Sequence, residues 1–536
     1  MKWIILCALA VSSLHAAELE SAVESKQSFE VSSVIAAPVA KLGVHMAVAG
    51  IDTLDLLVFS ESEAARVHVG KGFALIHASW DFEAYRHFSK ALKHDPECLM
   101  AYCGVVLSMS SPTHEFAEER AIAFNRMLTL AEHKEEGEFY YPEHERLYAV
   151  AIAELMVNGA GRGARVFAQI AKNYPNDLHA QTLAVYLNNG GYNALGNPRV
   201  RQRKALETVR KLVEEHPENQ MLLNFLIVLQ IEAPQQAVDF KAELLPLAQK
   251  LVALSGESVA SWQALLGAVA WRSGELELAE SAFRKSVSLY QSWKEMNNVD
   301  LADCEGLIRV ELFLSAVLHD QGKTAEAASL AKKVKAYKVE EGRKISTGAL
   351  ALRWHAALMP AKLYMEAENY TEARKSLPVL PKRKKLDSYS AVVTGYQLCL
   401  DSLISLEQGK LSNAQALHNR SSDLLTQLQE MQGEASRTPD FGSFLRSLNS
   451  LIILHNEVAA KLSKNSGLSY NWYKAAIDAQ KPGSRLLPPD ILYPMEHRLG
   501  LYFEGVGESQ KAKQAFEAAV LQRPSYRKSR KKVKAL

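Results

Sequence analysis

The chain has 536 residues, of which 48% are hydrophobic and 23% are charged. This composition excludes a disordered or low-complexity protein and is typical of a folded chain with about three or four domains, or of a long repeat array. Because 62 Lys and Arg residues are balanced by 60 Asp and Glu residues, the net charge of +2 gives no reason to expect a polyanionic partner.

The first 17 residues, MKWIILCALAVSSLHAA, have the three parts of a secretory signal peptide. Lys2 supplies the positive end, Trp3 to Leu14 form an apolar run, and Ala16 and Ala17 are the small residues of a cleavage site. The alternative is an uncleaved anchor, but the run is shorter than the ~20 residues that a spanning helix needs. We therefore predict a cleaved signal peptide, a periplasmic or extracellular location, and no membrane span in the rest of the chain.

One spacing recurs four times along the chain: a small residue, a bulky apolar residue four positions on, a small or apolar residue three further on, and a proline after another five. The four copies are Ala84, Phe88, Ala91 and Pro96; Gly163, Phe167, Ile170 and Pro175; Ala205, Val209, Leu212 and Pro217; and Ala512, Phe516, Ala519 and Pro524. The first three positions of each copy share one helix face, and the proline ends the helix. The pattern predicts helices that approach closely at the small residue, with the bulky side chain filling the remaining gap.

These residues resemble the tetratricopeptide repeat (TPR), a helix-turn-helix unit of 34 residues. The final unit, from Tyr493, matches the family pattern without a gap at Gly500, Gly507, Ala512, Phe516, Ala519 and Pro524. About eight units can be recognised, at irregular spacing. The resemblance implies an all-α fold, an α-solenoid of helix-turn-helix (TPR-like) repeats that form a right-handed superhelix. Asp95–Met109 and the closing stretch also resemble large exported bacterial repeat proteins of unassigned function.

The sequence divides into five parts: the signal peptide at residues 1–17, an N-terminal helical segment at 18–60, a TPR-like array at 61–420, an irregular helical insertion at 421–486, and a terminal repeat unit with a basic tail at 487–536. The tail has six basic residues between Arg527 and Lys534. We interpret it as a polar cap, because cations suit a helix C-terminus. Nucleic-acid binding is the alternative, which export and the balanced net charge disfavour.

No motif for catalysis, cofactor binding or metal binding stands out. The sequence has no His-Glu-x-x-His, no Walker phosphate loop and no Gly-x-Ser-x-Gly elbow. Histidines cluster early in the chain, at His68, His77, His87, His94, His114, His133 and His144. Their separations place no pair at i, i+3 or i+4, so we interpret them as scattered surface or capping residues. Cys98, Cys103, Cys304 and Cys399 are predicted to be buried thiols.

The resemblance implies a concave surface lined by positions 2, 5, 9 and 12 of the first helix in each unit. The candidate residues are Arg66, Val69, Phe73 and Ile76 in the first unit; Glu145, Tyr148, Ile152 and Leu155 in the unit that starts at His144; and Pro494, His497, Leu501 and Glu504 in the last unit. Two interpretations stay open. These side chains either bind a partner or pack against the N-terminal segment and the neighbouring helices.

Three functions are compatible with the sequence. The repeats, the signal peptide and the lack of catalytic motifs favour an exported, non-catalytic scaffold that binds a protein or peptide on the concave face. One alternative is an exported hydrolase with a site in the irregular helical regions. The other is a periplasmic carrier that holds an apolar ligand inside the superhelix, which only the apolar lining supports.

Overall fold

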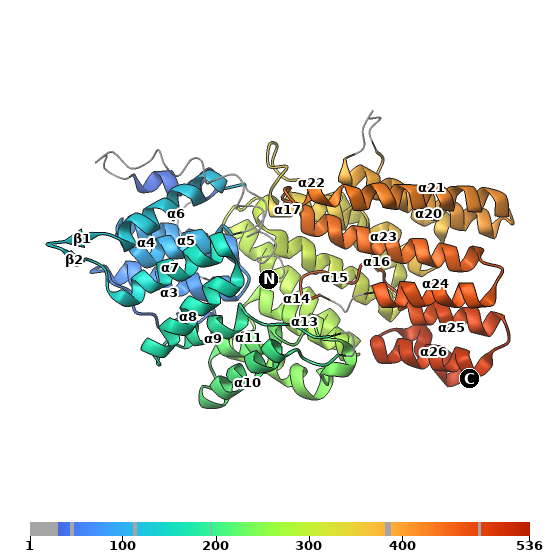
Figure 1. The fold of residues 1–536 in the computed structure, drawn as a ribbon, viewed down its shortest axis with the longest axis horizontal. Helices are drawn as coiled ribbons and strands as arrows, with labels where there is room; N and C mark the ends of the chain where they lie inside the picture. The colour runs from blue at the N-terminus through green and yellow to red at the C-terminus, as the bar shows by residue number, and fades with distance from the viewer. Residues whose placement is uncertain (1–29, 43–47, 111–114, 194–195, 381–386, 481–483) are drawn as a thin grey trace. The chain divides into compact units, whose positions relative to one another are not determined.

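A computed structural model describes residues 30–42, 48–110, 115–193, 196–380, 387–480 and 484–536. The signal peptide predicted at residues 1–17 lies outside them. Within these ranges the regular structure is helical apart from one short hairpin, β1 (Lys134–Glu135) and β2 (Glu138–Phe139). None of the described helices has the length and apolar character needed to cross a membrane. The prediction of an all-α fold is confirmed (Figure 1).

The chain forms two compact units. The first unit comprises residues 1–231, 246–263 and 289–304, and the second comprises residues 232–245, 264–288 and 305–536. The helices up to residue 231 are η1 (Val31–Val34), α2 (Ala37–Ala40), α3 (Glu63–His77), α4 (Asp81–His94), α5 (Leu99–Ser108), α6 (Ala117–Ala131), α7 (Glu143–Asn158), α8 (Ala160–Asn173), α9 (Leu178–Tyr186), α10 (Val200–Glu215) and α11 (Gln220–Val228).

The remaining helices follow in chain order. Those up to residue 304 are η2 (Gln235–Ala237), η3 (Phe240–Leu244), α12 (Leu245–Leu254), α13 (Ala260–Arg272), α14 (Leu276–Met296) and η4 (Leu301–Asp303). The rest are α15 (Glu305–Gln321), α16 (Thr324–Lys335), α17 (Thr347–Ala351), η5 (Leu352–Ala356), α18 (Met359–Glu366), α19 (Tyr370–Ser376), α20 (Ser388–Glu407), α21 (Leu411–Glu430), α22 (Gln432–Ala435), α23 (Phe441–Leu462), α24 (Ser466–Ala479), α25 (Met495–Gly505), α26 (Ser509–Gln522) and α27 (Arg527–Ala535).

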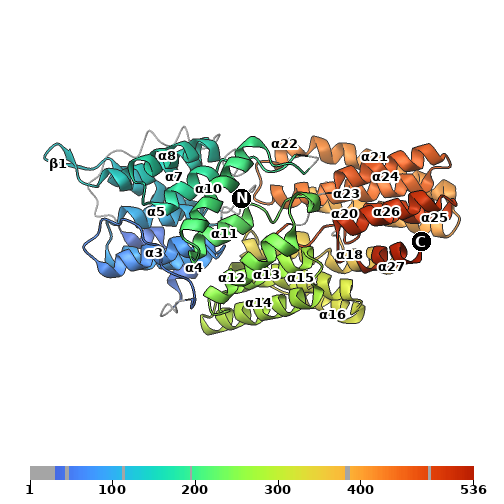
Figure 2. The ribbon, with the colours of Figure 1, turned by 90° about the horizontal axis from the view of Figure 1, so that it is seen from below.

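Consecutive helices pack against each other as pairs joined by short turns. In the first unit α3 pairs with α4 and α7 with α8 (Figure 2). In the second unit the pairs include α15 with α16, α20 with α21, α23 with α24, and α25 with α26 (Figure 1). One pair cannot bury its apolar face alone, so neighbouring pairs share a core. This is the α-solenoid architecture that the repeat pattern predicts.

The predicted contact between a small residue and an aromatic ring recurs in both units. Phe516 of α26 lies against Gly500 of α25, where an added Cβ would come within 2.5 Å of the ring. Phe88 of α4 lies against Gly72 of α3 in the same way, again at 2.5 Å. In both pairs the ring is fully buried. The glycine therefore sets how closely the two helices of a pair approach, as expected from the sequence.

The turns also agree with the pattern. Gly507, between α25 and α26, has a φ of +80°, a backbone conformation that side chains disfavour. Pro524 follows the last residue of α26 by two positions, and the other three prolines of the pattern stand at the same offset after α4, α8 and α10. The four cysteines beyond the predicted signal peptide are buried, as predicted.

A serine hydrogen bond ties the two helices of a pair together. Ser315 of α15 donates to the carbonyl of Ala327 on α16 at 2.8 Å. Ser402 of α20 makes the same bond to Ala414 of α21, also at 2.8 Å. Both serines are buried, and each lies where the last pair has Gly500. The small residue at this position therefore either admits an aromatic ring or bonds to the facing backbone.

Two predicted boundaries are corrected by the structure. The segment expected to be helical at 18–60 has only η1 and α2 among its described residues, and residues 48–60 contain a turn at 49–50 and no helix. From Leu54 to Phe59 half-buried and exposed positions alternate with a period of two, which suits a strand-like conformation. The insertion at 421–486, predicted to be irregular, contains the regular pair α23 and α24. Leu451 of α23 packs on Gly395 of α20, a close contact between two neighbouring pairs.

Candidate functional site

An extended stretch of chain, residues 48–62, precedes α3 in the first unit; we call it the extended segment. Leu54, Leu56 and Val58 are half-buried, whereas Asp55 and Leu57 between them are exposed. Leu57 exposes 63% of its surface. This alternation places one side of the segment on the helices and the other in solvent. The segment forms no β-ladder within the described residues, and its backbone bonds instead to side chains and to one carbonyl of α3.

The start of the extended segment is held by one glutamine. Gln220, the first residue of α11, donates from Nε2 to the carbonyl of Gly50 at 2.9 Å. Its Oε1 accepts from the N–H of Asp52 at 3.0 Å. Ser258 adds a third bond, from its hydroxyl to the carbonyl of Ala49 at 2.8 Å. All three bonds go to backbone groups, which every residue type carries. The site still requires glycine at position 50, because Gly50 has a φ of +78° and an added Cβ would lie 2.0 Å from the carbonyl oxygen of Ser255.

The middle of the extended segment depends on a glycine of α3. The N–H of Leu54 donates to the carbonyl of Gly70 at 3.3 Å. A Cβ added at Gly70 would lie 2.6 Å from the Leu54 carbonyl oxygen and 2.6 Å from Cγ2 of Thr53. Contacts that short do not occur between real atoms, so only glycine lets the segment lie this close to α3.

The end of the extended segment is bound by two residues of the predicted groove. The N–H of Phe59 donates to Oε1 of Glu145 on α7. Arg66 of α3 donates to the carbonyl of Ser60, whose hydroxyl donates to Asp95 at 2.5 Å. Ser62 then begins α3 by accepting from the N–H of Ala65. Arg66 and Glu145 both stand at repeat position 2, each in its own helix pair. In these two pairs, α3 with α4 and α7 with α8, position 2 therefore faces the segment.

The carboxyl group of Glu145 is in an unfavourable place for a charge. Burial raises its pKa to about 8; the hydrogen bond from the Phe59 N–H opposes the rise, and nearby Asp95 adds to it. The second carboxyl oxygen is buried and accepts no hydrogen bond from the described residues. At neutral pH the protonated form therefore dominates. The group that holds the end of the segment is mostly an uncharged acid.

The other predicted groove residues lie as follows. Val69, Phe73, Glu145, Tyr148, Ile152, Leu155, Pro494 and His497 are buried. Ile76 and Leu501 are half-buried, and Arg66 and Glu504 are exposed. The buried apolar members pack inside the helix pairs. Of the predicted groove residues that lie in the first compact unit, Arg66 and Glu145 hydrogen-bond to the extended segment.

Tyr148 has a structural partner. Its hydroxyl donates to Asp177 at 2.8 Å, and His144 Nε2 lies 2.9 Å from the same carboxylate. Burial favours the neutral acid, but the bonds from His144 and Tyr148 outweigh it, and the pKa of Asp177 is lowered. Asp177 also accepts from the N–H of Ala180 and so begins α9. These groups connect α7 to α9.

The histidines are closer together than the sequence analysis predicted. Nδ1 of His68 on α3 lies 3.0 Å from Nδ1 of His87 on α4, and the ring of His94 stacks on that of His68. His87 and His94 are two helical turns apart, so they share a face of α4 that meets α3. The interpretation as scattered residues is wrong for these three; His114 lies outside the described residues. No group of three potential ligands in the described ranges has metal-binding geometry.

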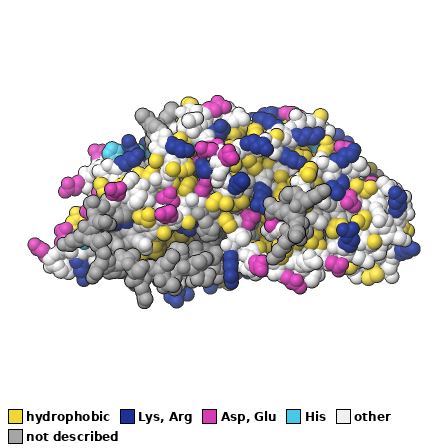
Figure 3. All heavy atoms as spheres, turned by 90° about the horizontal axis from the view of Figure 1, so that it is seen from above, with side chains coloured by type: hydrophobic (Ala, Val, Ile, Leu, Met, Phe, Trp, Pro, Cys, Tyr) yellow, Lys and Arg dark blue, Asp and Glu magenta, His cyan; other side chains and the backbone are white. Residues whose placement is uncertain are grey.

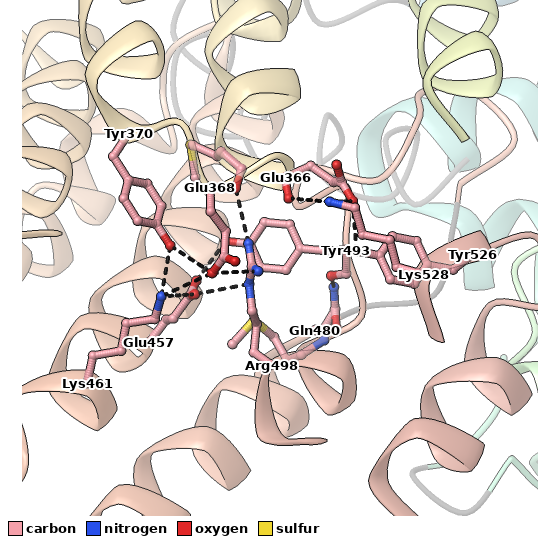
Figure 4. A network of polar contacts seen from close by, with 12 residues as sticks. Glu366, Glu368, Tyr370, Glu457, Lys461, Gln480, Tyr493, Arg498, Tyr526 and Lys528 are labelled. Carbon is pink, nitrogen blue, oxygen red and sulfur yellow. Dashed lines mark hydrogen bonds and ion pairs between the residues drawn. The ribbon is translucent and has the colours of Figure 1, made fainter. Parts of the chain in front are cut away.

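The second unit contains a buried network of charges (Figure 4). Arg498 of α25 forms ion pairs with Glu457 of α23 at 3.2 Å and with Glu368 at 2.8 Å. Its guanidinium group lies 4.2 Å from the ring centre of Tyr493, whose hydroxyl donates to Glu457 at 2.6 Å. Burial works against the charge, but Glu457, Glu368 and the neighbouring tyrosines together outweigh it, and the pKa of Arg498 is raised well above its ordinary value. Nothing in the repeat pattern points to this network.

The basic tail joins a second set of charges in the same unit (Figure 4). Glu366 accepts from Tyr526 at 2.7 Å and pairs with Lys528 at 2.9 Å and with His319 at 2.6 Å. Burial opposes ionisation, but these partners lower the pKa of Glu366 to about 2. Part of the tail is therefore bound to α15 and α18, as a cap would be. On the face drawn in Figure 3, basic and acidic side chains are interspersed.

Comparison with known proteins adds little. No family model and no curated protein matches the chain. Solved structures that match include the human IFIT1 dimer with m7Gppp-AAAA, at 13% identity over 79% of this chain and 91% of that one, with a TM-score of 0.35. The structure of Naa15/Naa10 bound to HypK-THB matches at 12% identity over 88% and 86%, with a TM-score of 0.23. Likenesses this distant carry no argument, so the fold assignment rests on the helix pairs themselves.

Proposed function

We propose that this chain is an exported, non-catalytic scaffold that binds a segment of a partner protein on its helix array. The observation that carries the proposal is the extended segment, which the helices of the first unit hold through its backbone. Side chains placed as Gln220, Arg66 and Glu145 are suited to an extended peptide, because they bond to groups common to all sequences. Export rests on the pattern of residues 1–17 and is part of the proposal.

The binding face is tested with a photo-crosslinking residue placed at Ile76 or Leu501, both half-buried positions of the predicted groove. Val200 and Leu521, which expose 75% and 60% of their surfaces on α10 and α26, are the matched controls. The mature chain, residues 18–536, is mixed with periplasmic and envelope extract and irradiated. We expect one protein to crosslink from Ile76 or Leu501 and not from the controls. Equal crosslinking from all four positions, or none, would contradict the proposal.

Export is tested separately by N-terminal sequencing of the chain recovered from cell fractions. A periplasmic or secreted chain that begins near residue 18 supports export. A cytoplasmic chain that keeps residues 1–17 contradicts it and leaves the scaffold proposal to the crosslinking test.

A further inference from the structure

The extended segment occupies the same kind of site that a bound peptide would need. Half-buried and exposed residues alternate along it, with apolar side chains at the half-buried positions 54, 56 and 58. Helix side chains hold its backbone at Gly50, Asp52, Phe59 and Ser60. Its inward side chains are only half-buried, unlike the core residues Phe73 and Phe88 of the adjacent pair. The free energy needed to release a segment held in this way is lower than that needed to open a helix of the core.

We propose that the extended segment is an internal ligand, which a partner's extended segment with apolar residues at every second position displaces from the first unit. This inference rests on the proposed function and names the chemistry of the partner. The spacing of the groove contacts sets that chemistry. Leu54, Leu56 and Val58 mark the positions where the helices accept apolar side chains, and Asp55 and Leu57 mark those that face solvent.

The contacts are also compatible with exchange. The three bonds at the start of the segment and the two at its end involve backbone groups of the segment. A foreign chain in the same register can make all of them if it has a glycine where the segment has Gly50, since a Cβ there would lie 2.0 Å from the carbonyl oxygen of Ser255. Gly70 provides space for any backbone, since its missing side chain is what admits the carbonyl of Leu54. The resident segment competes as a tethered ligand at high effective concentration, so the partner binds the closed chain more weakly than the open one.

The experiment uses the full chain and a fluorescent peptide with the sequence of residues 49–61. Leu56→Asp places a charge on the inward side of the resident segment and should release it. Leu57→Asp places the same charge one position along, where the side chain is 63% exposed, and should leave the segment bound. We expect the peptide to bind the Leu56→Asp chain about tenfold or more tightly than the wild-type and Leu57→Asp chains, in proportion to the fraction of open groove.

Two further variants test the site itself. In the Leu56→Asp background, Gln220→Ala should abolish peptide binding, because it removes both bonds to residues 50 and 52. Gly70→Ala should release the resident segment and also exclude the peptide, since the added Cβ collides with either chain. Equal binding to all variants, or no binding to a folded Leu56→Asp chain, would overturn the inference. So would a wild-type dimer in light scattering that exchanges extended segments between two copies.

Hydrogen exchange of the wild-type chain covers the case in which Leu56→Asp does not fold. Amides of Asp52, Leu54 and Phe59 should exchange through an opening that leaves α3 and α4 protected. If they exchange only together with α3 and α4, the segment is part of the core and the inference fails. Failure here with successful crosslinking at Ile76 or Leu501 would leave the scaffold proposal standing. Peptide binding without crosslinking would support the internal ligand and count against the scaffold proposal.

Discussion

In the first unit, the extended segment is held mainly by hydrogen bonds to its backbone, and the second carboxyl oxygen of Glu145, which binds its end, has no hydrogen-bond partner among the described residues. In the second unit, Glu457 is also fully buried, but Arg498, Tyr493 and Lys461 surround it. Both regions join parts of the chain that are far apart in sequence. The first uses contacts that cost little to break, whereas the second leaves a buried charge when either partner is removed. Only the first is suited to exchange.

The largest effect is expected from Arg498→Met. It leaves Glu457 and Glu368 without their main counter-charge, and breaking a buried pair costs about 3–5 kcal/mol. The loss of stability is measured by hydrogen exchange of amides in α23 and α25. This method reports on each region separately, which is needed because a chain of two units does not unfold in one step. Lys511→Met, at an exposed i, i+3 pair with Glu508 on α26, is the control and should change nothing measurable. Unchanged protection in Arg498→Met would remove the contrast between the units.

Glu145→Gln tests the uncharged anchor through pH. The pKa of Glu145 is raised from 4.5 to about 8 in the folded chain, so the contribution of this group to stability is fully present below pH 4.5 and is lost as the pH rises to about 8. The loss is at most about 1.4 kcal/mol per pH unit. Glutamine keeps an oxygen for the Phe59 N–H and does not titrate. Denaturant unfolding at pH 5 and pH 9 should show a smaller pH effect in the variant, and parallel curves would refute the assignment.

Gly72→Ala and Gly500→Ala test a feature that the two units share. Each added Cβ would lie 2.5 Å from a buried phenylalanine ring, and overpacking of this kind costs about 1–3 kcal/mol. Similar losses of thermal stability in the two variants are expected. Gly505→Ala is the control on α25, since nothing lies within 4 Å of its added Cβ. A loss in only one of the two units would mean that their pairs are not built alike.

The smallest effect is expected from Ser402→Ala. It removes the hydrogen bond to the carbonyl of Ala414, worth about 1 kcal/mol, and leaves that carbonyl with its helical bond. Ser422→Ala, at an exposed position of α21, should have no effect in the same denaturant titration. Equal midpoints for both variants would show that the bond does not stabilise the pair.

The sequence predicts what depends on short spacings. Phe516 meets Gly500 and Pro524 ends α26 because these contacts lie within one helix pair, where the periodicity of the helix fixes which side chains share a face. The same periodicity places Arg66 and Glu145 at one repeat position, and both hydrogen-bond to the extended segment. Their role in binding a partner stays a prediction.

The remaining features depend on pairs that no local pattern connects. Gln220 and Gly50 are 170 residues apart, and Arg498 and Glu457 belong to different helix pairs. The extended segment was predicted to be helical because its apolar residues are dense, and its alternation over Leu54, Leu56 and Val58 is short. The meeting of His68 with His87 required the pairing of α3 with α4, which a search for neighbours within one helix does not include.

Tyr85 of α4 gives the extended segment a second attachment upstream. Its hydroxyl accepts from the N–H of Ala36 and donates to the carbonyl of Val34, each at 2.7 Å. With Ser62 fixed as the cap of α3, the chain between Ala36 and Ser62 is closed at both ends. A closed loop gains less conformational entropy on release than a free arm of the same length. Tyr85→Phe should therefore make the segment easier to release, although the hydroxyl touches no part of it.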